Sequence, residues 1–105
     1  MVKNGMRPVH PGEILLEDFL KESDPPINAN TLAKAIEVPA NRITAIIKGQ
    51  RGITGDTAVR LAAFFNTTAE FWMNLQKTYE LRLAEPAVPE KIIRHIRDKG
   101  SLLVS

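Results

Sequence analysis

The sequence contains 105 residues, of which 44% are hydrophobic and 25% are charged, and it contains no cysteine. These values are typical of one globular domain with a modest core. They exclude disulfides and thiolate metal sites, and no apolar run is long enough to span a membrane. The first ten residues lack the apolar segment of a signal peptide, so we expect a cytoplasmic protein.

Charge is distributed unevenly along the chain, although the net charge is only +2. Residues 1–27 carry three basic and five acidic side chains, whereas residues 28–60 carry five basic and two acidic ones. A local positive excess is typical of a surface that binds a polyanion such as DNA. On charge alone, however, a solvated surface with a random imbalance is the simpler interpretation.

Apolar residues recur with helical periodicity along most of the chain, and no strand pattern competes with them before the last residues. Pro11 suits the first position of a helix, and His10 before it is most simply interpreted as a cap. Asn28 is the expected N-cap of the second helix, and Gly49 suits the left-handed position after the third. The pattern predicts an all-α fold with helices over about residues 11–23, 29–36, 40–48, 55–66 and 68–84.

The C-terminal region is expected to follow as a separate element. A helix break is predicted at Glu85-Pro86, because the residue before a proline disfavours the helical conformation. A last helix is predicted from Pro89 to just before Gly100, and the apolar residues 102–104 are interpreted as a short strand or a packed arm. The predicted organisation is an N-terminal arm at 1–9, a five-helix domain at 10–84, and a C-terminal helix and tail at 85–105.

Two short helices, at 29–36 and 40–48, lie close together, and the second has a polar, cationic outer side. On a helical wheel, Ile43, Ile46 and Ile47 form its buried stripe. A short helix of this kind fits the DNA major groove, where Arg and Asn bond guanine and adenine bidentately. The pair therefore predicts a helix-turn-helix, although two core helices of another all-α domain remain an alternative. The outer face and its flanks comprise Asn41, Arg42, Thr44, Ala45 and Lys48, and Arg51 follows just after.

Three sequence blocks carry a family resemblance: HPGEIL at 10–15, VPANRITAIIKGQRGIT at 38–54 and FWMNLQKTYEL at 71–81. Together with DTAVRLAAFF, they make residues 10–84 similar to HigA-type antitoxins, which belong to the lambda-repressor-like (XRE) helix-turn-helix class. The resemblance implies a five-helix domain that binds double-stranded operator DNA as a homodimer. It also implies that the protein neutralises a small RelE-like ribonuclease toxin of the HigB type.

The sequence departs from the pattern of the wider class at three positions. Ala29 stands where many members have a glutamine that bonds a phosphate, so that contact is lost or moved to Asn28 or Asn30. Glu37 occupies the turn position usually held by glycine, at a cost of about 1 kcal/mol if its backbone is left-handed. Pro39 replaces the usual Ser or Thr cap. The DNA-binding residues predicted from the helix and the resemblance are Asn30, Pro39, Asn41, Arg42, Thr44, Ala45, Lys48 and Arg51.

No pattern of catalytic or metal-binding residues stands out. His10 and His95 have no partner at metal-ligand spacing, and no nucleophile motif or glycine-rich phosphate loop is present. We therefore expect neither an enzyme nor a metal or other cofactor.

Acidic residues cluster on the first predicted helix. Glu17, Asp18 and Glu22 lie beside its apolar face, and a toxin that holds RNA must have a basic working face, so we expect the toxin to dock there. The alternative is an ordinary solvated acidic face. The like-charge pairs Glu13–Glu17 and Asp18–Glu22 are expected to oppose the helix slightly.

A homodimer is expected because one short recognition helix reads too few base pairs for genomic specificity. Its contact is predicted from apolar residues at 71–83 and from Ile92, Ile93 and Ile96, unless this stripe closes the monomer core instead. Three functions remain open at this point: an antitoxin and autorepressor, a stand-alone or phage-type repressor without a toxin, and a protein-interaction module that has lost DNA binding.

Overall fold

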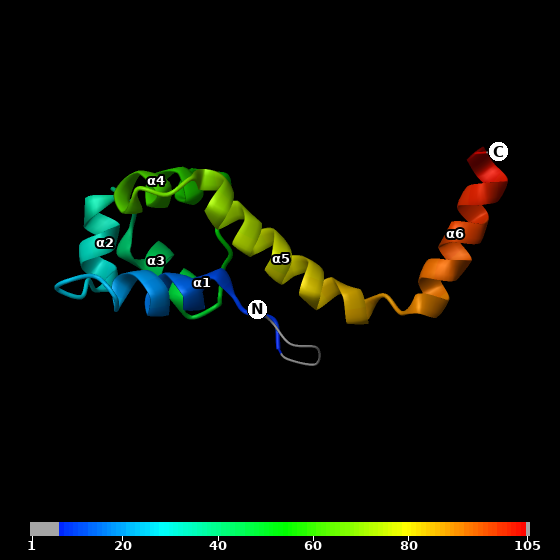
Figure 1. The fold of residues 1–105 in the computed structure, drawn as a ribbon, viewed down its shortest axis with the longest axis horizontal. Coiled ribbons are helices and arrows are strands. Elements are labelled where there is room, and N and C mark those ends of the chain that lie inside the picture. Colours follow the sequence, from blue (N-terminus) through cyan, green and yellow to red (C-terminus); the bar gives the residue numbers. More distant parts are fainter. Residues whose placement is uncertain (1–6, 105) are drawn as a thin grey trace.

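The computed structural model describes residues 7–104, and throughout that range the regular secondary structure is helical. The first helices gather into a rounded body, from which one long helix leads away to a last, isolated helix (Figure 1). The all-α prediction is thus confirmed. The elements are α1 (Pro11–Ile14), η1 (Leu15–Leu20), α2 (Ala29–Ala35), α3 (Ala40–Ile47), α4 (Gly55–Phe65), α5 (Ala69–Ala87) and α6 (Glu90–Val104).

The first predicted helix is a single helical segment with a π-helical second half. His10 is its N-cap, as expected, since His10 Nδ1 accepts a hydrogen bond from the Gly12 amide at 2.9 Å. From Leu15 onward the backbone widens, and the Lys21 amide bonds the Leu16 carbonyl five residues back at 3.0 Å. Most of the predicted N-terminal arm lies outside the described residues.

The core of the body forms where α1, η1 and the following helices bring large apolar side chains together around Trp72. Each such side chain contributes about 1.5–3 kcal/mol when it is fully removed from water. Trp72 carries one polar atom, and its Nε1 donates to Thr67 Oγ1 at 2.8 Å, which satisfies the indole in the core. The residues of this cluster with no exposed surface are Leu15, Leu32, Ile43, Ile46, Ala58, Leu61 and Trp72.

The turn between α2 and α3 is closed by backbone hydrogen bonds. The Val38 amide donates to the Ala33 carbonyl at 3.0 Å and the Glu37 amide donates to the Lys34 carbonyl at 3.3 Å. This is a Schellman motif, which requires a left-handed residue at its centre. Glu37 adopts φ 61° there, as expected for the position that glycine usually holds. The same arrangement ends α3, with Gly49 at φ 75°.

Two C-terminal predictions are wrong. α5 does not break at Glu85-Pro86 but runs through Pro86 to Ala87. Pro86 lies in the last turn on an exposed stretch, so the one hydrogen bond it removes can be replaced by water. α6 likewise continues through Gly100 to Val104, so residues 102–104 are helical rather than a strand or a packed arm. Glycine in a helix costs only about 1 kcal/mol relative to alanine.

The end of α5 and α6 form what we call the C-terminal arm, residues 81–104. The arm stands away from the rounded body (Figure 1), and seven of its large apolar side chains are exposed while Ile93 is half-buried. Leu81 is 53% exposed and Ile96 is 58% exposed. The alternative that the stripe of the last helix closes the monomer core is therefore wrong. The division of the chain after residue 84 stays a prediction.

Candidate nucleic-acid interface

α3 shows the two-sided character that its sequence predicts. Ile43 and Ile46 have no exposed surface, and Ile47 is partly buried beside them. Asn41 and Lys48 are exposed on the opposite side, while Arg42, Thr44 and Ala45 are partly buried at its flanks. The core therefore holds one side of α3 and leaves a polar, cationic side on the surface.

The beginning of α3 is made without a side-chain cap. Pro39 occupies the N-cap with φ −61° and ψ 143°, which agrees with the absence of the hydroxyl found in the wider class. Thr44 bonds its own helix, since its hydroxyl donates to the Ala40 carbonyl at 3.2 Å. The lone pairs of that hydroxyl stay available as acceptors.

Arg42 takes part in an ion-pair network that the sequence did not predict. Its Nη1 donates to Asp56 Oδ2 at 2.8 Å, and Arg60 Nε donates to the same oxygen at 3.1 Å. The network joins the first turn of α3 to the first turn of α4. The hydrogen bond from Arg42 is the main cause that lowers the pKa of Asp56, and Arg60 adds to it.

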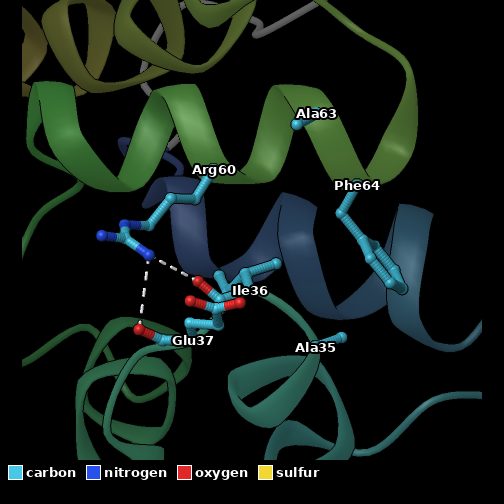
Figure 2. A pocket seen from close by; sticks show the side chains of 6 residues that line it. All are labelled: Ala35, Ile36, Glu37, Arg60, Ala63 and Phe64. Carbon is cyan, nitrogen blue, oxygen red and sulfur yellow. Dashed lines mark hydrogen bonds between the residues drawn. The ribbon is translucent and has the colours of Figure 1, made fainter.

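Arg60 also fixes the turn of the helix-turn-helix. Its Nη1 donates to the Ile36 carbonyl at 2.7 Å and to the Glu37 carbonyl at 3.3 Å (Figure 2). These are carbonyls at the end of α2 that the helix itself leaves unbonded. Beside them lies a pocket of about 390 Å³, and the residues that line it are Ala35, Ile36, Glu37, Arg60, Ala63 and Phe64.

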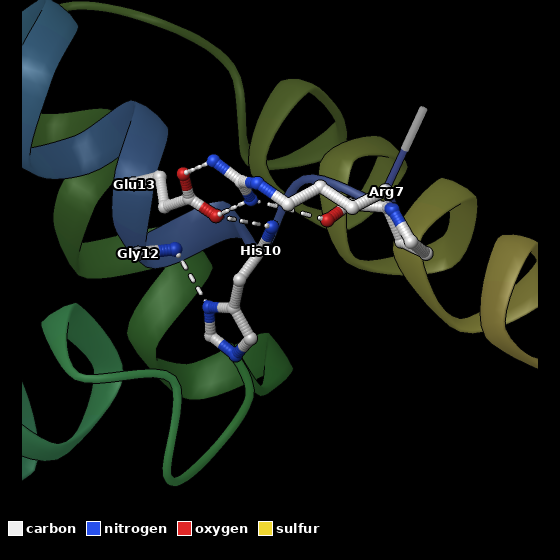
Figure 3. A network of polar contacts seen from close by, with 5 residues as sticks. Arg7, His10, Gly12 and Glu13 are labelled. Atoms are coloured by element: carbon white, nitrogen blue, oxygen red, sulfur yellow. Dashed lines mark hydrogen bonds and ion pairs between the residues drawn. The ribbon is translucent and has the colours of Figure 1, made fainter. Parts of the chain in front are cut away.

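The N-terminal end of α1 supports α3 from the other side. A Cβ added to Gly12 would lie 1.8 Å from the Ile46 carbonyl oxygen, so only glycine permits this approach of the two backbones. Figure 3 shows the polar contacts that hold this end. Arg7 bonds both Glu13 carboxylate oxygens, at 2.6 and 2.8 Å, and this bonding lowers the pKa of Glu13.

His10 connects α1 to α5. Its ring packs edge-on against Tyr79, with centroids 4.8 Å apart, and only 7% of the residue is exposed. Burial disfavours the charged imidazolium and lowers the pKa of His10, against smaller opposing effects of Glu13 and of the Arg51 backbone. The histidine therefore acts as an N-cap of α1 and as a packing residue between α1 and α5.

The segment after α3, which carries Arg51, is held by Gln76 of α5. Gln76 Oε1 accepts from the Ile53 amide at 2.8 Å, and its Nε2 donates to Glu80 at 2.7 Å. Gln76 is 8% exposed, so these bonds satisfy a buried polar side chain. Sequence reasoning missed this role. The available signal was a glutamine within the apolar stripe of the fifth helix, four residues before a glutamate.

The remaining predicted residues lie on the surface. Asn30 is exposed in the first turn of α2, and Arg51 is exposed after α3. Asp18 and Glu22 are also exposed, whereas Glu17 pairs with Lys21 at 3.0 Å. Glu13 and Glu17 each have a cationic partner, so the expected mutual repulsion of these two carboxylates is offset.

Within residues 7–104, no three His, Asp or Glu side chains gather as a metal site would require. None of the helices in this range combines the length and the apolar content needed for a membrane span. The exposed polar side of α3 and the segment after it is the candidate site that the described residues present most clearly.

Comparison with known proteins assigns the class of this fold. The Helix-turn-helix family model matches residues 27–72, which contain α2, the turn, α3 and α4. This match, the buried stripe of α3 and the Schellman turn before it define a helix-turn-helix domain of the XRE type.

Individual relatives narrow the class further. An addiction module antidote protein of a HigA family from Coxiella burnetii is 52% identical, with a TM-score of 0.75 over 85% of this chain and 95% of that one. Antitoxin HigA of Pseudomonas aeruginosa, solved with the higBA promoter, is 48% identical, with a TM-score of 0.76 over 82% and 91%. Virulence-associated protein I of Dichelobacter nodosus is 48% identical over 79% of this chain and 75% of its own length. The chain belongs to the HigA family of helix-turn-helix antitoxins.

Proposed function

We propose that this protein is the antitoxin of a type II toxin–antitoxin pair and the repressor of its own operon. The observation that carries the proposal is the outer side of α3, which is polar, cationic and exposed on a helix whose other side is fixed in the core. The related Pseudomonas aeruginosa antitoxin was solved with promoter DNA, which supports DNA binding by this chain as well. Because it acts on operator DNA, we place the protein in the cytoplasm.

We assign the residues of the α3 surface to base edges or to phosphates according to the length and the hydrogen-bonding groups of their side chains. Asn41 and Arg42 can read base edges, since their side chains offer paired hydrogen-bonding groups. Lys48 and Arg51 are exposed cations suited to phosphates. Thr44 and Ala45 allow close approach to the groove wall, and Asn30 and Pro39 lie at the beginnings of α2 and α3, where the chain faces the backbone of the duplex.

Homodimerisation is proposed through the C-terminal arm. Its exposed apolar side chains form a surface that one chain alone does not bury. Two copies joined there place two α3 helices on the two halves of a palindromic operator, about 34 Å apart. Sedimentation equilibrium at micromolar concentration is expected to give a dimer, and a monomer that binds one operator one-to-one would contradict it.

The DNA-binding proposal is tested with a triple variant, R42A/K48A/R51A. A gel shift on the DNA upstream of the gene is expected to show loss of specific binding, with the fold checked by circular dichroism. The matched control is K21A/K77A, which removes two exposed cations outside α3 and outside the C-terminal arm and is expected to bind nearly as the wild type. Full operator affinity in the triple variant would refute the proposed interface.

The toxin, a ribonuclease of the RelE-like HigB type, is proposed to dock on Glu17, Asp18 and Glu22. These residues are exposed on η1 and just after it, in the net-negative part of the sequence. Opposite charge speeds association and fixes the register of a complex. The variant E17K/D18K/E22K is expected to slow toxin association at low salt. An unchanged rate would show that the acidic face is only a solvated surface.

The alternative function is a stand-alone or phage-type repressor without a toxin. The two functions predict different neighbouring genes, since only an antitoxin is expected beside a gene for a small basic ribonuclease. Co-expression of that neighbour separates the two: growth arrest by the neighbour alone, relieved by this protein, supports the antitoxin. The proposal includes no catalytic step and no cofactor.

A further inference from the structure

Asp56 lies where the proposed base-reading arginine meets the rest of the domain. It occupies the first turn of α4, and its carboxylate accepts hydrogen bonds from Arg42 at 2.8 Å and Arg60 at 3.1 Å, both at Oδ2. Arg42 and Asp56 are 14 residues apart in sequence. The contact therefore depends on how the fold brings the first turn of α3 near the first turn of α4.

The carboxylate is itself held in place. Arg60, its second partner, also donates to the Ile36 and Glu37 carbonyls at 2.7 and 3.3 Å (Figure 2). Arg60 thus joins Asp56 to the turn between α2 and α3. A partner fixed in this way restricts the Arg42 side chain more than a mobile surface carboxylate could.

Only one nitrogen of Arg42, Nη1, bonds Asp56. A guanidinium has five N–H donors in one plane, so this bond leaves other donors for a second acceptor. Reading guanine requires two donors from such a plane, in a fixed orientation. Arg42 is 27% exposed at its side chain, which agrees with an arginine that is partly held and partly presented.

Asp56 also places a negative charge beside this arginine, and its side chain is 56% exposed. A carboxylate there repels DNA phosphates. On DNA that offers Arg42 no matching base, no base contact offsets this repulsion. We propose that Asp56 is a positioning residue for sequence discrimination: it orients Arg42 toward a base and reduces binding to DNA that lacks this base. The inference rests on the proposed DNA-binding function.

The test compares D56A with D56N and measures affinity for two duplexes of equal length at the same salt. One duplex is the DNA upstream of the gene, and the other has a random sequence. D56A is expected to weaken operator binding about 10-fold, as for a lost oriented base contact, while binding to the random duplex tightens severalfold. A merely structural role would weaken both. D56N keeps an oxygen acceptor, so it is expected to retain most of the operator affinity while binding random DNA more tightly.

The double variant R42A/D56A separates failure of this inference from failure of the proposed interface. If Asp56 acts through Arg42, the double variant is expected to discriminate no worse than R42A alone. If R42A lowers discrimination and D56A leaves it unchanged, the role of Asp56 is refuted and the interface stands. If R42A leaves operator binding unchanged, both the base-reading role of Arg42 and the role of Asp56 are refuted.

Discussion

The rounded body formed by α1 to α4 and the first half of α5 differs sharply from the C-terminal arm. In the body, Leu15, Ile43 and Trp72 have no exposed surface, whereas Ile96 in the arm is 58% exposed and Leu103 is 83% exposed. The turns of the body are closed by hydrogen bonds and left-handed residues. One part of the chain is thus stabilised by its own contacts, whereas the other leaves apolar side chains exposed, and there we propose that a second copy packs. Substitutions should therefore change folding in the body and association in the arm.

The largest effect on folding is expected from Gly12→Ala. The new Cβ would overlap the Ile46 carbonyl oxygen, so α1 and α3 must move apart, at a cost of about 3 kcal/mol or more. The control is Gly55→Ala, because a Cβ at Gly55 meets nothing within 4 Å and alanine favours the helix by about 0.5–1 kcal/mol. Urea denaturation measures both. Equal stability of the two variants would contradict the close crossing of α1 and α3.

The next effect is expected at Gln76. Gln76→Leu leaves the Ile53 amide buried without its acceptor, which costs about 1–3 kcal/mol. The exchange Q76E/E80Q keeps an acceptor for Ile53 and reverses the bond between residues 76 and 80, so it is expected to recover most of the loss. Gln50, which is exposed, is the control: Q50L should change stability by less than about 0.5 kcal/mol. No recovery in the exchange variant would argue against this bond.

A smaller, pH-dependent effect is expected from His10. Burial lowers its pKa below the ordinary value of 6.5, so the unfolded chain binds more protons than the folded one just below pH 6.5. The contribution of His10 to the free energy of unfolding is therefore complete above pH 6.5, and it decreases as the pH falls below 6.5 toward the lowered pKa of the folded state. His10→Asn keeps an N-cap acceptor but does not titrate. Denaturation curves between pH 7.5 and 5 should show a steeper loss for the wild type, and parallel losses would disprove the effect.

The smallest effect on folding is expected in the arm. The variant I92S/I96S changes two exposed side chains and should alter the unfolding free energy of the monomer by less than about 0.5 kcal/mol per site. The same variant should weaken dimerisation, measured by sedimentation equilibrium against the wild type. A destabilised monomer, or a dimer of unchanged affinity, would contradict the claim that the arm serves association rather than folding.

The sequence predicted local features well because they depend on one helix at a time. The buried stripe of α3, the cap at Asn28 and the left-handed Gly49 follow from periodicity and backbone chemistry, whereas the left-handed Glu37 agrees with the turn position that the family resemblance implies. The continuation of α5 through Pro86 was missed because local propensity treats proline as a break, whereas one lost bond in an exposed last turn is tolerated.

The contacts around the site were harder to predict than the helices. The pairing of Asp56 with Arg42 could not be predicted from the sequence, because it joins residues 14 positions apart whose approach depends on the tertiary fold. The hydrogen bond from the Ile53 amide to Gln76 could not be predicted either, because the two residues are 23 positions apart in sequence. The exposed cations of α3 were predicted as such, and their contacts with DNA stay a prediction.

The central claim, that α3 and the segment after it form the DNA-binding surface, is tested most directly by the salt dependence of operator affinity. Each phosphate contact contributes about 0.9 to the slope of log affinity against log salt. We predict that K48A/R51A reduces the magnitude of this slope by about two per chain that contacts DNA, whereas K21A/K77A leaves it unchanged. An unchanged slope in K48A/R51A, or an equal reduction in both variants, would contradict the claim.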